Sequence, residues 1–139
     1  MMSFNAIQGA SIIATHAVAT KVLLSFTVRV YQFLQPDPKR RESIESMPVV
    51  QRFQKAQMNE SEYAGLLVAL LFFYHFQGQD EMTTLGSTLA VTGQVGYVWA
   101  RTFLGYPQIP AIAMALTRYG GLALLCWPLL QLAFATTAE

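Results

Sequence analysis

The stretch 52–74 constrains the fold of this chain more than any other. Its first part, 52–63, is polar and dense in charge, and it continues without a proline into the apolar run 64–74. At roughly 100° per residue, one helical face collects the polar stripe Arg52, Lys55, Asn59, Glu62 and Tyr63. Burying these groups on a helix that then becomes wholly apolar is costly unless they meet a polar partner. We therefore expect one helix whose polar stripe is a binding surface.

The composition favours a membrane environment. Hydrophobic residues make up 53% of the chain and charged residues only 12%, about half the charged share of a typical soluble domain. So few charges cannot cover a water-exposed surface, and we expect an integral membrane protein. A net charge of +1 gives no indication of nucleic acid as a partner.

Four apolar segments are each long enough to cross a bilayer core of about 30 Å. They lie at 10–34, 48–76, 82–104 and 109–135. The sequence therefore predicts an all-α fold, a single four-helix membrane domain over 1–139. Between the first two segments, the loop 35–47 carries the basic cluster Lys39-Arg40-Arg41, and the positive-inside rule places this loop in the cytosol.

Side chains within the other segments indicate packing. The third segment is rich in small residues that allow close helix approach in membranes: Gly86, Ser87, Thr88, Ala90, Thr92, Gly93 and Gly96. Gln94, Tyr97 and Arg101 share one face of it. His16 has no second histidine or carboxylate at ligand spacing. We expect it to be a hydrogen-bonded interior residue, and we predict no metal site.

Four spans would place five cations in the cytosolic leaflet: Arg29, Arg52, Lys55, Arg101 and Arg118. We expect Glu62 to oppose them. The remaining positive charge calls for an anion, either a lipid phosphate or a small ligand with carboxylates. Alternatively, these are interface cations whose side chains reach the lipid head groups, which suits Lys55 and Arg118 less well because they lie deeper.

The second segment resembles a known family. The pattern Arg-x-x-(Arg/Lys)-Ala-(Gln/His)-x-Asn-x-x-Glu-(Tyr) is matched by Arg52, Lys55, Ala56, Gln57, Asn59, Glu62 and Tyr63. Ala100-Arg101 followed by Gly105-Tyr106, and an arginine inside the fourth segment, agree with it. The chain is similar to the membrane-associated proteins of eicosanoid and glutathione metabolism, which include microsomal glutathione transferases, leukotriene C synthase and the five-lipoxygenase-activating protein.

The resemblance implies a four-helix membrane homotrimer with glutathione in the cytosolic leaflet between adjacent subunits. It implies a glutathione transferase or peroxidase that acts on lipophilic substrates admitted from the lipid. The implied glutathione-binding residues are Arg52, Lys55, Gln57, Asn59, Glu62, Tyr63, Tyr97, Arg101 and Tyr106. Arg29 and Arg118 are the implied catalytic residues. The cations suit the two carboxylates of glutathione, Glu62 suits its ammonium, and a guanidinium near the thiol would lower the pKa of that thiol.

The chain also departs from the family pattern. The third segment of the family usually ends in Arg-x-x-Tyr-x-x-Gly-Tyr, but the middle tyrosine falls here on Leu104 or Thr102. Lys55 replaces an arginine common in members that use glutathione, and lysine cannot make the same bidentate contact. Three alternatives therefore stay open: a non-catalytic member that binds lipid or serves as an accessory subunit of a larger membrane assembly, a helical membrane protein of another kind, and a soluble bundle. The endoplasmic reticulum is the expected location, with the outer mitochondrial or another organelle membrane as the alternative.

Overall fold

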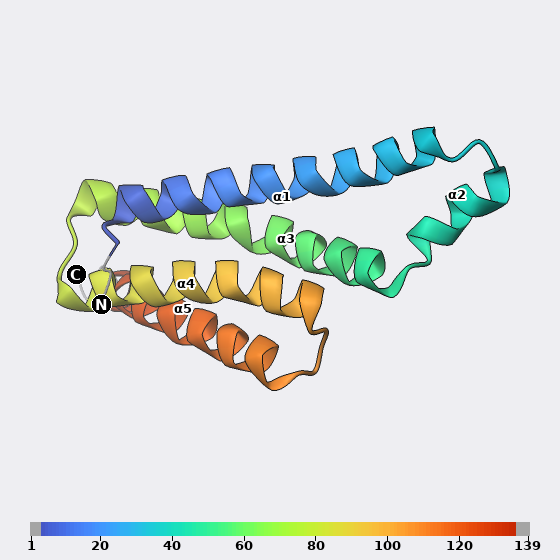
Figure 1. Ribbon diagram of the computed structural model, residues 1–139. Helices are drawn as coiled ribbons and strands as arrows, with labels where there is room; N and C mark the ends of the chain where they lie inside the picture. The colour runs from blue at the N-terminus through green and yellow to red at the C-terminus, as the bar shows by residue number, and fades with distance from the viewer. Residues whose placement is uncertain (1–3, 136–139) are drawn as a thin grey trace.

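The computed structural model describes residues 4–135, apart from the side chains of 41–43. Over this range the chain is helical with no strand, which confirms the all-α prediction. The helices are α1 (Ala6–Leu34), α2 (Pro38–Glu45), α3 (Pro48–Gln77), α4 (Glu81–Phe103) and α5 (Ile109–Ala135). Figure 1 shows α1 lying along α3 and α4 lying along α5, with the end of α1 and α2 projecting beyond the turn between α4 and α5.

The loop expected at 35–47 contains the short helix α2, and this corrects the prediction of a plain loop. Asp37 caps the helix by accepting a hydrogen bond from the backbone N–H of Lys39 at 3.0 Å, and Pro38 occupies its first turn. The helix escaped prediction because it is short and polar, so it has no apolar periodicity. Of its described side chains, Ile44 is the buried one.

Helix α4 packs against α1, α3 and α5, and its contact with α5 is close. A Cβ atom added to Gly93 would lie 2.3 Å from the backbone nitrogen of Arg118, and one added to Gly121 would lie 2.3 Å from that of Ala90. These glycines let the two backbones touch, as the small residues of the third segment predicted.

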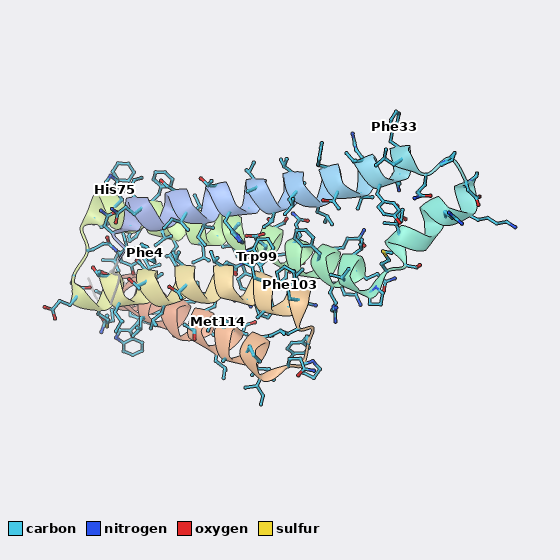
Figure 2. All side chains as sticks on the ribbon, viewed as in Figure 1. Phe4, Phe33, His75, Trp99, Phe103 and Met114 are labelled. Atoms are coloured by element: carbon cyan, nitrogen blue, oxygen red, sulfur yellow. The ribbon has the colours of Figure 1, made fainter. Side chains whose placement is uncertain are left out.

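The surface of the bundle is apolar over long stretches. Phe33, Phe76 and Ile109 are each at least 80% exposed, and Figure 2 shows Phe33 pointing outward near the end of α1. Such a surface is unfavourable in water and suited to lipid. Helices α1 and α5 are long and apolar enough to cross a membrane. Helices α3 and α4 carry more polar residues, and that they cross the membrane stays a prediction.

Candidate functional site

A cavity of about 410 Å³ lies between the first turns of α3 and the turn that joins α4 to α5. It is lined by Arg52, Lys55, Arg101, Leu104, Gly105, Tyr106 and Gln108. Three of these residues are cations, and no lining residue is a carboxylate. We call this space the cation cavity; its charge suits an anionic ligand.

The turn between α4 and α5 brings the cations together. Gly105 has φ = 85°, in the left-handed region that favours glycine. A Cβ atom there would lie 3.3 Å from Cδ of Arg52, so the missing side chain lets Arg52 pack across the turn. The Nε atom of Arg52 is buried and has no hydrogen-bond partner, which leaves a donor for a bound anion.

Behind the cation cavity, Arg118 is 1% exposed. Its Nη1 donates to Asn59 Oδ1 and to Gln94 Oε1, each at 2.9 Å, and its Nη2 donates to the Tyr119 hydroxyl at 3.1 Å. Its guanidinium carbon lies 4.0 to 4.8 Å from three ring centroids, those of Tyr63, Tyr97 and Tyr119. Tyrosine rings and amide oxygens thus surround the guanidinium of Arg118, and the rings attract it through cation–π interactions. This guanidinium forms no ion pair with a described carboxylate.

Tyr97 connects this cluster to the cation cavity. Arg101 Nη1 donates to the Tyr97 hydroxyl at 2.8 Å, while the guanidinium of Arg118 lies over the ring of the same tyrosine. Gln94, Tyr97 and Arg101 do share one face, and that face meets Arg118. Gln94 was not among the predicted site residues, although its position on this face pointed to it.

The structure brings eight of the predicted site residues together. Arg52, Lys55, Arg101 and Tyr106 line the cation cavity, and Asn59, Tyr63, Tyr97 and Arg118 form the cluster behind it. It does not bring the other three into the cation cavity.

Those three lie elsewhere on the single chain. Arg29 is exposed and lines a separate cavity of about 280 Å³ with Glu45 and Gln54. Gln57 donates to the hydroxyl of Ser61 at 2.8 Å. Glu62 is exposed.

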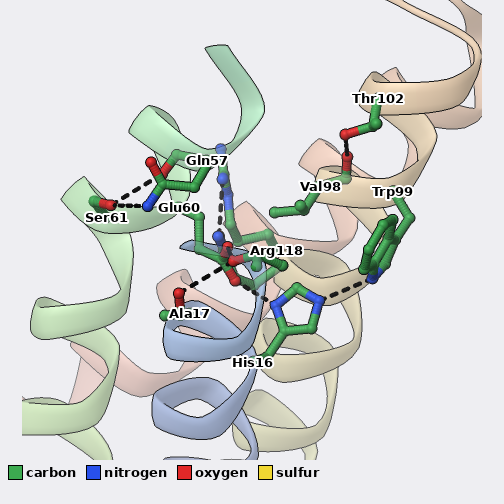
Figure 3. A network of polar contacts seen from close by, with 11 residues as sticks. His16, Ala17, Gln57, Glu60, Ser61, Val98, Trp99, Thr102 and Arg118 are labelled. Carbon is green, nitrogen blue, oxygen red and sulfur yellow. Dashed lines mark hydrogen bonds and ion pairs between the residues drawn. The ribbon is translucent and has the colours of Figure 1, made fainter. Parts of the chain in front are cut away.

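The sequence predicts that Glu62 opposes the cations, but on the single chain Glu62 is exposed and forms no ion pair with a described residue. The carboxylate buried among the described helices is Glu60. Glu60 is 0% exposed and sits on the side of α3 that faces α1. Thr20 donates to Glu60 at 2.5 Å. His16 Nδ1 contacts the other carboxylate oxygen, and Trp99 donates to His16 Nε2 at 2.8 Å (Figure 3). His16 is therefore a hydrogen-bonded interior residue, as predicted.

A sequence signal could have found Glu60. Ala56, Glu60, Ala64, Leu67 and Leu71 recur at helical spacing on one face of α3, and all five are buried. A carboxylate on an otherwise apolar core face requires internal partners. The polar stripe occupies a neighbouring face of the same helix, and Glu60 lies outside it.

Comparison with known families decides the relationship. The model of the MAPEG family matches residues 7–131, most of the chain. The chain belongs to the MAPEG family, the membrane-associated proteins of eicosanoid and glutathione metabolism. No curated protein and no solved structure matches it.

MAPEG proteins are helical membrane bundles, and the family includes membrane glutathione transferases and eicosanoid synthases. The resemblance seen in the second segment is thus confirmed. Membership and the two apolar helices make this chain an integral membrane protein. Members of the MAPEG family use glutathione as a substrate or cofactor.

Proposed function

We propose that this MAPEG chain is a membrane-bound glutathione transferase or glutathione-dependent peroxidase that acts on lipophilic substrates. The supporting observation is the cation cavity, in which Arg52, Lys55 and Arg101 converge without a carboxylate. Glutathione carries two carboxylates, which guanidinium and ammonium groups bind through charge-assisted hydrogen bonds.

We assign each residue of the site a role from its position. Arg52, Lys55 and Arg101 would hold the carboxylates, and a guanidinium near the sulfur would favour the thiolate that acts as nucleophile. In a transfer reaction the sulfur forms a bond to the electrophilic carbon, and the leaving group departs with its bonding electrons. Arg118 has almost no exposed surface, so we assign it the role of holding Asn59 and the tyrosines in place.

We further propose a homotrimer in which glutathione lies between adjacent subunits. Arg29 and Glu62 are exposed on the single chain, and a neighbouring subunit would give these charges a polar partner. Gln57 would join the same interface. We propose that the site lies on the cytosolic side of the membrane, because α2 carries the basic cluster. The endoplasmic reticulum is the membrane that we propose, with the outer mitochondrial or another organelle membrane as the alternative.

Binding to glutathione tests the proposal directly. Purified protein in lipid nanodiscs should bind glutathione, measured by titration calorimetry. Arg52→Ala and Arg101→Ala should each weaken binding by about tenfold or more, because a charge-assisted hydrogen bond contributes about 1.5–3 kcal/mol. Lys39→Ala is the matched control: it removes an exposed cation from α2 and should leave binding unchanged. Wild-type protein that shows no heat of binding would end the proposal.

One observation favours a second function, a non-catalytic member that binds lipid or serves as an accessory subunit. The two positions on which the family tyrosine can fall offer no phenol. Thr102 is buried and donates to the carbonyl of Val98 at 2.7 Å, and Leu104 is apolar. If the isolated protein conjugates glutathione to an aryl halide, this second function is excluded.

A further inference from the structure

Glu60 is a buried carboxylate that does not line the cation cavity. Its two carboxylate oxygens are both engaged by α1, one by His16 Nδ1 and the other by Thr20 Oγ1 at 2.5 Å. Glu60 is fully buried, Thr20 is 1% exposed, and the side chain of His16 is 14% exposed. A carboxylate enclosed in this way links two helices with little competition from water.

The contacts continue from α1 to α4 in one direction. The indole N–H of Trp99 can only donate, so His16 Nε2 accepts. His16 Nδ1 then carries the hydrogen and donates to Glu60 (Figure 3). The ring of Trp99 also stacks on Phe103 at 5.8 Å between centroids and contacts Phe53 at 6.0 Å. Trp99 therefore anchors α4 to α1 through a hydrogen bond and to α3 through ring packing.

Asn59, the residue before Glu60 on α3, links α3 to α5. Asn59 accepts from Arg118 of α5, and Arg118 also donates to Gln94 of α4. The side chains thus join α3 to α1, α1 to α4, α4 to α5, and α5 back to α3. We call this set the four-helix ring; its members are His16, Asn59, Glu60, Gln94, Trp99 and Arg118.

The four-helix ring lies next to the cation cavity along the chain. On α3, Lys55 comes four residues before Asn59, and on α4, Arg101 comes two residues after Trp99. The distance between the cations of α3 and the cation of α4 therefore depends on how α3 and α4 are held at the ring. We propose that Glu60 is a positioning residue for the cation cavity, acting through His16 and Trp99. As a positioning role for glutathione, it rests on the proposed function.

The test compares Glu60→Ala, Glu60→Gln and Trp99→Phe in lipid nanodiscs. Glutamine can accept from His16 through its oxygen and donate to Thr20, whose hydroxyl can then donate to the Ala17 carbonyl 3.1 Å away. Trp99→Phe removes one hydrogen bond and keeps an aromatic ring in the stack. Two quantities are measured: glutathione affinity by calorimetry, and hydrogen exchange of the backbone in the cavity segments 52–56 and 103–108.

We expect Glu60→Ala to bind glutathione about tenfold more weakly, the loss expected when one charge-assisted hydrogen bond to the ligand is weakened. Exchange in the cavity segments should rise in parallel. Glu60→Gln should restore both quantities, and Trp99→Phe should fall between. Glu81→Ala and Trp127→Phe are the controls, since both side chains are exposed, and they should match wild type.

Other outcomes decide against the proposal. Unchanged affinity and exchange in Glu60→Ala, or a Glu60→Gln variant as impaired as Glu60→Ala, would overturn it. If wild-type protein binds no glutathione, the proposed function fails, and exchange alone decides the positioning role. Should Glu60→Ala fail to fold, Trp99→Phe carries the test, and wild-type exchange in that variant would overturn the proposal.

Discussion

At the scale of single residues, burial separates charges that look alike in the sequence. Arg118 is enclosed by amide oxygens and tyrosine rings, whereas Arg29 is exposed. Glu60 is enclosed by donors from α1, whereas Glu62 is exposed. A buried charge contributes only if its neighbours replace the water that it has lost, and the structure supplies those neighbours for Arg118 and Glu60.

Removing the guanidinium of Arg118 should therefore destabilise the bundle. Arg118→Met leaves the acceptors of Asn59 and Gln94 without their donor, which we expect to cost about 1–3 kcal/mol. Thermal unfolding in detergent micelles, followed by circular dichroism, measures this loss. Lys39→Met, on exposed α2, is the control and should stay close to wild type. Equal unfolding temperatures for both variants would contradict the assignment.

At the scale of helices, the contact between α4 and α5 depends on glycines at defined positions. Two adjacent glycines of α5 differ sharply. A Cβ atom at Gly121 would meet the backbone of Ala90 at 2.3 Å, whereas one at Gly120 would meet nothing within 4 Å. Space at position 121 is therefore what lets the two helices touch.

This contrast gives a matched pair of substitutions. Gly121→Ala should push α4 and α5 apart and cost about 1–3 kcal/mol, the usual range for overpacking. Gly120→Ala should be neutral or stabilise by roughly 0.5–1 kcal/mol, because alanine loses less backbone entropy in a helix. Chemical unfolding of both variants in the same detergent measures the difference, and a loss of similar size at both positions would refute the close contact.

The start of α4 depends on Asp80. The Asp80 carboxylate accepts from the Thr83 hydroxyl at 2.6 Å and from its backbone N–H at 2.7 Å. These hydrogen bonds from Thr83 hold the pKa of the Asp80 carboxyl below its ordinary value. Because the pKa is lower in the folded state, ionised Asp80 stabilises the fold above the unfolded pKa of about 3.9. That contribution is lost as the pH falls through the folded value.

The prediction concerns the difference between wild type and Asp80→Ala. We expect the gap in their unfolding temperatures to be constant near neutral pH and to shrink as the pH falls below about 4. Thr83→Val, which lacks the hydroxyl donor, should show a smaller change with pH than wild type. A gap that does not depend on pH would show that the cap acts through shape alone.

At the scale of the whole molecule, the helices set which ends share a side of the membrane. If all four long helices cross it, α2 and the turn between α4 and α5 lie on one side. The turn at Gly78–Asp80 and both termini lie on the other. Figure 1 shows the same grouping, with the described ends of the chain at the opposite end of the bundle from α2.

Cysteine labelling tests this arrangement. In a Cys126→Ser background, Lys39→Cys should react with an impermeant maleimide from the cytosolic face of sealed vesicles, because α2 carries the basic cluster. Gln77→Cys, exposed at the end of α3, should react only from the opposite face. Labelling of both positions from the same face would contradict a bundle in which α3 crosses the membrane.

The sequence by itself determined the helical class, the approximate extent of the four long helices, the membrane setting and the family. Segment length, apolar runs and the spacing of residues 52–63 are local properties, so they can be read from one segment without knowing which helix packs against it. The apolar periodicity of α3 places Glu60 on the core face of that helix, but only the tertiary structure decided which partners enclose the buried charges. Glu60 differs from Glu62 because Glu60 contacts Thr20 of α1. Thr20 lies forty residues before Glu60 in the sequence. The turn at Gly105 likewise decided that Arg52, Lys55 and Arg101 share one cavity, because a charge on one helix gains a partner only when another helix is packed beside it.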